Sequence, residues 1–465
     1  MTKMDWKQEI LKRKEAFLDD TVRLLKIESV LDEESATEEA PLGKGVKEAL
    51  DFMLKKGKES GFSVKNVDNL AGHIEYGDGK EMIGILCHLD VVPAGDGWTY
   101  PPFGGTIEGG RLYGRGSLDD KGPTMAAFYA LKAVKESGLP LSKRIRLILG
   151  TDEESHWRCV TRYFEKEEMP TMGFAPDADF PIIIAEKGIA DFDLLFHGPD
   201  DNERGALQVE RFAAGRRYNM VPDWAEAQLA GGPDLQAVAE QFSRFLKEKG
   251  LSGDWRMEGD TLRLQMKGKS AHAMEPFNGV NAALHLAAFL AGITSHRYFS
   301  FIRDYLFDDV YGNRLGISGS DDISGRLTVN AAIFSFENGK GKIGLNFRYP
   351  VTYKMKEQLE KVAERAGKYG FSPGNFSDSR PHYVDSESVL VKTLKKVYEE
   401  QTGKEAKLLA IGGGTYARSL QSGVAFGPLF PGRPDTAHQA NEFVEIDDLL
   451  EAAAIYARAI YELAK

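Results

Sequence analysis

Cysteine is scarce in this chain: Cys87 and Cys159 are the only two among 465 residues. Two thiols are too few for a disulfide framework or for a four-thiolate metal site, so the composition favours a reducing compartment. Stability must then come from buried apolar side chains. A chain of this length has room for two or three domains with large cores.

Long apolar runs and an excess of basic residues are also missing. The longest apolar candidate, LHLAAFLAGI at 284–293, is shorter than the ~18 residues of a membrane span. The N-terminal stretch MTKMDWKQEILKRKEAF shows neither the apolar core nor the cleavage site of a signal peptide. Acidic residues outnumber basic ones by 70 to 59, which gives a net charge of −11 and argues against nucleic acid as the main partner. We therefore expect a cytoplasmic protein with no nucleic-acid or membrane partner.

Short apolar runs and helical patterns alternate in the first part of the chain. MIGILC (82–87) and RIRLILG (144–150) are typical of buried strands, and the helical TMAAFYALKAVKES (124–137) lies between them. This β-α-β order predicts an α/β domain with a mixed, largely parallel sheet flanked by helices. Before it we expect one amphipathic helix within the first 30 residues and a second around 46–60.

The pattern changes near Gly188. Alternating segments such as ADFDLLF and KIGLNFRY, together with two helical stretches, predict a separate α+β domain that ends near the turn-rich segment 371–383. Helical α/β patterns resume after it. We therefore predict a discontinuous domain made of residues 1–187 and 382–465, with an inserted domain at 188–381.

Two candidate ligand clusters follow the first predicted strand and precede the next helix. His88 and Asp90 in CHLDVVP are two residues apart at a strand end, so both side chains point to the same side. Asp119 and Asp120 lie in the glycine-rich loop of GRGSLDDKGP. Ligands of such sheets bind at the carboxyl ends of the strands. Taken alone, however, the first pair is better explained as a surface histidine and a turn aspartate, and the second as a helix cap.

A third acidic cluster, Asp152, Glu153 and Glu154 in GTDEES, follows the second apolar strand. Adjacent carboxylates repel one another unless protons or cations neutralise them. One glutamate could bind a metal ion while its neighbour takes a proton from water, although a solvated acidic loop would have the same sequence. Asp177 in FAPDADFP and His438 in PDTAHQANE complete a set of two histidines and three carboxylates that suits a pair of zinc-like ions: His88, Asp119, Glu154, Asp177 and His438.

At this point the sequence resembles the di-metal aminopeptidase/aminoacylase superfamily of cocatalytic metallopeptidases, and specifically its bacterial PepV-type dipeptidases. Nine ordered stretches between residues 87 and 442 support the resemblance: CHLDVVPAGDGW, GRGSLDDKGP, GTDEES, GFAPDADFP, NMVPDWA, GKSAHAMEPFNGVNA, NFRYP, GGGTYAR and AHQANE.

The resemblance implies two divalent metal ions per chain, with zinc as the default and manganese or cobalt as alternatives. His88 and Asp177 would bind one ion, His438 and Glu154 the other, and Asp119 would bridge the two.

Two further roles near the metals follow from the resemblance. Glu153 would be the general base, and Asp90 would hold the imidazole of His88 in the required tautomer without touching metal. We also expect the Asp119–Asp120 peptide bond to be cis.

The inserted domain resembles the family's lid. Asn219, His272 and Arg348 correspond to lid residues that reach the substrate, with His272 stabilising the oxyanion. The glycine run in GGGTYAR has no following G-K-[ST], so it is not a P-loop. The resemblance assigns it to substrate binding, and we expect its backbone N–H groups to bind a carboxylate as a nest does: Gly412, Gly413 and Gly414.

The implied activity is hydrolysis of small, unblocked dipeptides with broad side-chain tolerance, and β-alanyl dipeptides are candidate substrates. An N-acyl-amino-acid deacylase or desuccinylase of the same superfamily is the alternative enzyme, although the long insertion favours the dipeptidase. A non-catalytic peptide- or metal-binding protein is the alternative from another class, but it would not need Glu153. Shorter-lidded relatives take the lid histidine from a partner subunit, so the long insertion predicts a monomer.

Overall fold

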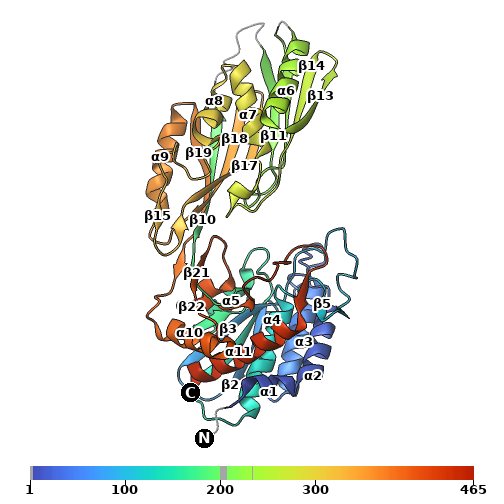
Figure 1. Cartoon of the computed structure of the whole chain (residues 1–465), viewed down its shortest axis with the longest axis vertical. Coiled ribbons are helices and arrows are strands. Elements are labelled where there is room, and N and C mark those ends of the chain that lie inside the picture. The colour runs from blue at the N-terminus through green and yellow to red at the C-terminus, as the bar shows by residue number, and fades with distance from the viewer. Residues whose placement is uncertain (1–3, 199–206, 233) are drawn as a thin grey trace. The chain divides into compact units, whose positions relative to one another are not determined.

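The computed structural model describes residues 4–198, 207–232 and 234–465. The chain forms two compact units (Figure 1). Unit 1 contains residues up to Ile184, Tyr383–Leu409 and Gly414–Lys465, and unit 2 contains Ala185–His382 and Ala410–Gly413. The assignment of a catalytic role to residues 1–187 and 382–465 and of a lid role to 188–381 stays a prediction.

Unit 1 is built on a mixed sheet with strand order β1-β2-β6-β3-β7-β22-β9-β20 and with β21 beside β9. Strand β3 is parallel to β6 and β7, and β22 is parallel to β7, whereas β2 is antiparallel to β6. The strands have these bounds: β1 Ser63–Val67, β2 Ala71–Tyr76, β3 Met82–His88, β6 Arg144–Gly150, β7 Met172–Ala175, β9 Ile182–Glu186, β20 His382–Tyr383, β21 Leu408–Ile411 and β22 Gly423–Ala425.

Every residue of β3 is buried. A central parallel strand is covered on both faces, which explains why its sequence is a continuous apolar run. Helices α4 and α11 contact each other and both contact β3 and β6, while α3 and α5 contact β1 and β2. The predicted α/β class with helices flanking a mixed sheet is confirmed. The helices are α1 Trp6–Leu11, α2 Lys14–Leu25, α3 Lys44–Glu59, α4 Lys121–Glu136, α5 Arg158–Lys166, α10 Val389–Thr402 and α11 Ile446–Ala464.

Short strands complete unit 1. Strand β24 pairs with β5, and β5 pairs with β4, while β23 pairs with β8. Their bounds are β4 Thr106–Glu108, β5 Arg111–Tyr113, β8 Ala178–Asp179, β23 Pro428–Leu429 and β24 Phe443–Glu445. The single helix expected in the first 30 residues is in fact two helices, α1 and α2, with a break at Lys12 and Arg13.

Unit 2 is an eight-stranded antiparallel sheet of order β13-β14-β12-β11-β17-β18-β10-β19. Helix α7 is apolar on nearly all sides and contacts β11, β12 and β14, so it is a buried core helix. Helices α6 and α9 cover other strands of the sheet. The elements are β10 Gly188–His197, β11 Gln208–Ala214, β12 Trp224–Ala230, α6 Leu235–Lys249, β13 Ser252–Glu258, β14 Thr261–Lys267, α7 Ala282–Ile293, α8 Arg297–Phe301, β15 Ser320–Asp321, β16 Gly325–Arg326, β17 Thr328–Glu337, β18 Lys340–Tyr349, α9 Met355–Gly367 and β19 Phe371–Ser379.

One predicted feature of unit 2 is wrong. Residues 371–379, read as turn-rich, form the edge strand β19, which pairs with β10 across a bulge between Phe192 and Leu194. Pro373 is tolerated because an edge strand leaves one row of N–H groups unpaired.

Among the described residues, no helix has both the length and the apolar character needed to cross a membrane.

Candidate metal centre

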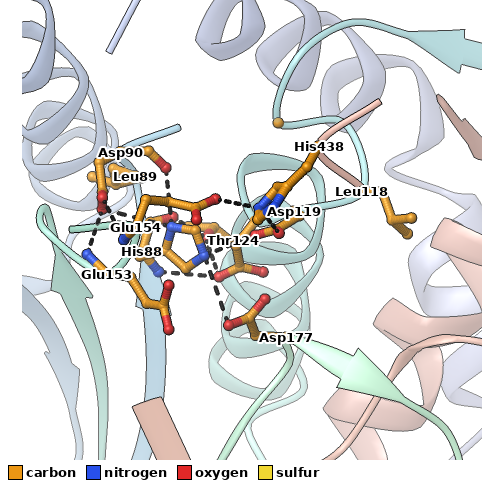
Figure 2. A network of polar contacts seen from close by, with 12 residues as sticks. His88, Leu89, Asp90, Leu118, Asp119, Thr124, Glu153, Glu154, Asp177 and His438 are labelled. Carbon is orange, nitrogen blue, oxygen red and sulfur yellow. Dashed lines mark hydrogen bonds and ion pairs between the residues drawn. The ribbon is translucent and has the colours of Figure 1, made fainter. Parts of the chain in front are cut away.

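The candidate ligands of unit 1 come from loops that follow adjacent parallel strands. His88 ends β3, Glu154 follows β6 and Asp177 follows β7. Because these strands are neighbours and parallel, their carboxyl ends meet at one edge of the sheet. Asp119 immediately precedes the Asp120 cap of α4 and reaches the same place (Figure 2).

Asp119 lies between the two histidines. Its Oδ1 is 2.9 Å from His88 Nε2, and its Oδ2 is 3.1 Å from His438 Nε2. His438 Nε2 also lies 2.9 Å from Glu154 Oε1, and His88 Nε2 lies 3.7 Å from Asp177 Oδ2 (Figure 2). The five predicted ligands thus converge, with one carboxylate oxygen of Asp119 facing each histidine.

The donor atoms fit divalent metal ions. His88 Nε2 is buried and has no hydrogen bond of acceptable geometry among the described residues, although carboxylate oxygens surround it. One atom each from His88, Asp119 and Glu154 lies within 4.8 Å of the others. Imidazole nitrogens mixed with carboxylate oxygens are the ligand set that zinc and related ions prefer. The residues that the structure brings together here therefore fit a divalent metal ion.

The electrostatics of the two histidines reflect this crowding of carboxylates. Hydrogen bonds to Asp119 and Glu154 raise the pKa of His438 to about 11. Burial lowers the pKa of His88, but the charge of Asp177 and the contact with Asp119 outweigh burial and raise it well above its usual value. The raised pKa of both histidines shows that the site favours positive charge. A divalent ion would supply that charge in place of the protons.

The pKa values of the carboxyl groups at this site shift in different directions. Burial, followed by the charge of Asp119, raises the pKa of Glu154 to about 7 and that of Asp177 to about 6. Burial also acts to raise the pKa of Asp119, but its close contacts with His438 and His88 bring it well below its usual range. Asp119 therefore favours the ionised form, with one oxygen facing each histidine.

Asp90 contacts both the following acidic loop and the His88 ring. Its two carboxylate oxygens accept the N–H groups of Glu153 (3.1 Å) and Glu154 (3.0 Å). His88 Nδ1 lies 3.0 Å from the backbone carbonyl of Asp90 but 3.6 Å from its carboxylate. Both the carbonyl and the carboxylate of Asp90 thus face Nδ1 of His88. The role of Asp90 in setting the tautomer of the imidazole stays a prediction.

Sequence reasoning missed the part played by Asp120. Its fully buried carboxylate accepts the N–H of His88 at 3.0 Å and the hydroxyl of Thr124 at 3.2 Å. It thereby fixes the end of β3 against the start of α4. The only signal in the sequence was the adjacency of two aspartates. The predicted cis peptide bond between Asp119 and Asp120 is confirmed.

The lid candidates lie in unit 2, where contacts link several of them. Met220 and His272 form an isolated β-bridge, and the N–H of Ala273 donates to the carbonyl of Asn219 at 2.8 Å. Arg348 Nη1 donates to the carbonyl of Gly412 at 2.9 Å.

The glycine run does not form the expected nest. None of its three residues lies in the left-handed region that such a concavity uses. The absence of a side chain at Gly412 has a steric reason instead, because a Cβ atom at this position would lie only 2.7 Å from Cβ of Met274. Gly413 belongs to unit 2 with Gly412, whereas Gly414 belongs to unit 1.

Comparisons with known proteins agree with this chemistry. Residues 84–462 match the model of a family described as Peptidase family M20/M25/M40. The chain is 52% identical to "Putative dipeptidase YtjP" of Bacillus subtilis (strain 168), over 99% of this chain and 100% of that protein. It is 42% identical to a "Putative dipeptidase" of Staphylococcus epidermidis, over 98% and 99% of the two chains.

Solved structures share the fold. The structure of human carnosine dipeptidase 1 matches with a TM-score of 0.56 and 16% identity, covering 98% of both chains. That of the di-peptidase Dug1p from Saccharomyces cerevisiae gives the same TM-score, identity and coverage.

Proposed function

The chain belongs to peptidase family M20/M25/M40 and is a peptide-bond hydrolase, and from this premise we propose that it cleaves unblocked dipeptides with the residues of the candidate metal centre. The observation that supports this most directly is the position of Asp119 between two histidines, each accompanied by a further carboxylate. We propose two divalent ions, with zinc first and manganese or cobalt as alternatives. Bound there, they would polarise the scissile carbonyl and lower the pKa of a coordinated water toward ~7.

Glu153 is the proposed general base. Its backbone is fixed on both sides, because its N–H donates to Asp90 Oδ1 at 3.1 Å and its carbonyl accepts the indole N–H of Trp157 at 2.7 Å. Burial raises the pKa of its carboxyl group, and the charges of Asp177 and Glu154 add to this. A more basic carboxylate is a better acceptor of the attacking water's proton, which Glu153 then passes to the leaving amine.

His272 is the proposed oxyanion donor. The N–H of Met274 donates to His272 Nδ1 at 3.2 Å, so a neutral ring carries its proton on Nε2. That tautomer can donate a hydrogen bond to a developing oxyanion. Asn219, whose carbonyl is tied to the residue after His272, is proposed to contact the substrate from the same segment.

Arg348 is the proposed anchor for the substrate's terminal carboxylate. A chain of hydrogen bonds orients it: Asp191 Oδ1 accepts from the Asn346 amide at 2.6 Å, and Asn346 Oδ1 accepts from Arg348 Nε at 2.9 Å. Guanidinium is suited to a carboxylate because its N–H groups form a planar fork. The glycine run 412–414 is proposed to line the same end of the substrate.

We propose that an acidic group near the metals holds the free ammonium, while Arg348 holds the carboxylate. Fixing both ends of the substrate in this way predicts a strict length with broad side-chain tolerance. An unblocked dipeptide, including a β-alanyl one such as carnosine, should be cleaved, whereas its N-acetyl form, its C-terminal amide and the tripeptide should be poor substrates. Comparing kcat/KM for these four compounds is the test. Cleavage of the N-acetyl form as fast as the dipeptide would favour a deacylase, and equal cleavage of the tripeptide would favour a general aminopeptidase.

We also propose that the functional unit is a monomer in which His272 serves its own chain. Mixing His272→Ala protein with Glu153→Gln protein should then leave activity at the sum of the two separate samples. Each variant measured alone at the same total concentration is the control. Recovery of activity in the mixture would mean that the histidine acts on the partner's site.

A further inference from the structure

A buried ion pair lies beside the candidate metal centre without facing it. Arg115 Nη1 is 2.6 Å from Glu442 Oε2, and each side chain is only 1% exposed. Arg115 follows β5 and Glu442 precedes β24, and these strands pair with each other. A buried ion pair is weak evidence for stability, because desolvation offsets most of its attraction. The role of this pair is therefore better judged from the other contacts that Arg115 and Glu442 make.

The second oxygen of Glu442 binds the backbone of the loop that carries Asp119. Glu442 Oε1 accepts the N–H groups of Gly116 at 3.1 Å, Leu118 at 2.9 Å and Asp119 at 3.2 Å. Three N–H groups converge on one carboxylate oxygen, and hydrogen bonds to a carboxylate paired with arginine are of the stronger, charge-assisted kind. The residue proposed to bridge both ions is thus held through its own amide.

The same pair also reaches the loops that carry the two histidines. Glu442 lies four residues after His438 on a loop in which His438 and Asn441 have φ of 62° and 60°. Non-glycine residues in this left-handed region are uncommon and persist when their surroundings fix them. Arg115 donates to the carbonyl of Ala94, at 3.2 Å, in the loop that follows His88.

We propose that Glu442 is a positioning residue that, through Asp119 and with Arg115, sets the spacing between the loops carrying the two histidines. The two metal positions then form together rather than separately. This inference rests on the proposed metal-dependent function, since it concerns how the same site is held. Glu442 touches neither metal nor substrate in this scheme.

The test measures metal affinity in Glu442→Gln protein by titrating the metal-free protein with zinc against a competing chelator. Weakening of both sites by about 10–100-fold is expected, the usual effect of removing a group that supports metal ligands. Glu445→Gln is the matched control. It lies three residues away on the same strand pair and also loses an arginine partner, since Arg111 Nε is 2.9 Å from Glu445 Oε1, but its carboxylate accepts no N–H from the Asp119 loop. Its zinc affinity should stay at the wild-type value.

Glu442→Asp is the second variant, because it keeps the buried charge but withdraws the carboxylate by one methylene from the three N–H groups. It should also weaken zinc binding, and the melting temperature of each metal-free variant separates this effect from lost stability. A lower melting temperature with wild-type zinc affinity in both Glu442 variants would overturn the inference, as would equal weakening in Glu445→Gln. If the wild-type protein bound no zinc or manganese, the proposed function itself would fail instead.

Discussion

Replacing Glu153 by glutamine is expected to lower kcat by roughly two to four orders of magnitude, the range that general acid–base catalysis contributes. Glutamine has nearly the same shape and keeps the backbone contacts to Asp90 and Trp157. It cannot, however, accept the proton of the attacking water. Metal content measured by elemental analysis should remain at the wild-type value, and KM should change little.

The adjacent residue provides the matched control. Glu154→Gln makes the same chemical change one position along the chain, but Glu154 Oε1 faces His438 Nε2 at 2.9 Å and is a proposed ligand. That variant should lose metal as well as activity. Near-normal turnover in a fully metallated Glu153→Gln protein would rule out the proposed base.

Changing Asp119 to asparagine is expected to remove both ions and all measurable activity. Each of its carboxylate oxygens faces a different histidine, and an amide supplies only one oxygen and no charge. Asp177→Asn, which alters a carboxylate near His88 only, should lose one ion and keep the other. Counting bound metal per chain in the two variants is the measurement.

Removal of metal from the wild-type protein by a chelator should have the same consequence as Asp119→Asn, but reversibly. Stepwise addition of zinc or manganese, followed by dipeptide hydrolysis, would then show which ion restores the higher rate. Retention of two ions by the Asp119→Asn protein would contradict a bridging role. Full activity after complete metal removal would contradict the metal-dependent mechanism altogether.

The sequence predicted best where physical patterns are strong. The apolar runs at 82–87 and 144–150 are the strands β3 and β6 because burial on both faces demands continuous apolar residues. Polar residues that end such strands meet at one sheet edge. His88 and Glu154 could thus be placed near each other, and the family resemblance supplied Asp177 and His438.

It predicted least where structure depends on exposed or purely backbone contacts. Strand β19 is mostly exposed and contains Pro373, so it shows no alternation and reads as a turn. The His88 ring also lies 3.0 Å from the backbone carbonyl of Asp90, a contact that leaves no trace in residue type. Glu442 likewise binds backbone N–H groups, and its only signal was a glutamate four residues after His438.

Unit 1 contains both the first and the last segments of the chain, and this has a consequence for biosynthesis. Strand β22 and helix α11 are translated only after the whole of unit 2, yet α11 contacts α4 and β3 in the core of unit 1. The core of unit 1 can therefore form completely only after unit 2 has been translated, and these long-range contacts cost the most loop-closure entropy. His438, a proposed ligand, is also translated only after unit 2. A product that terminates before it lacks the full set of proposed ligands, so peptide hydrolysis requires synthesis to continue past unit 2.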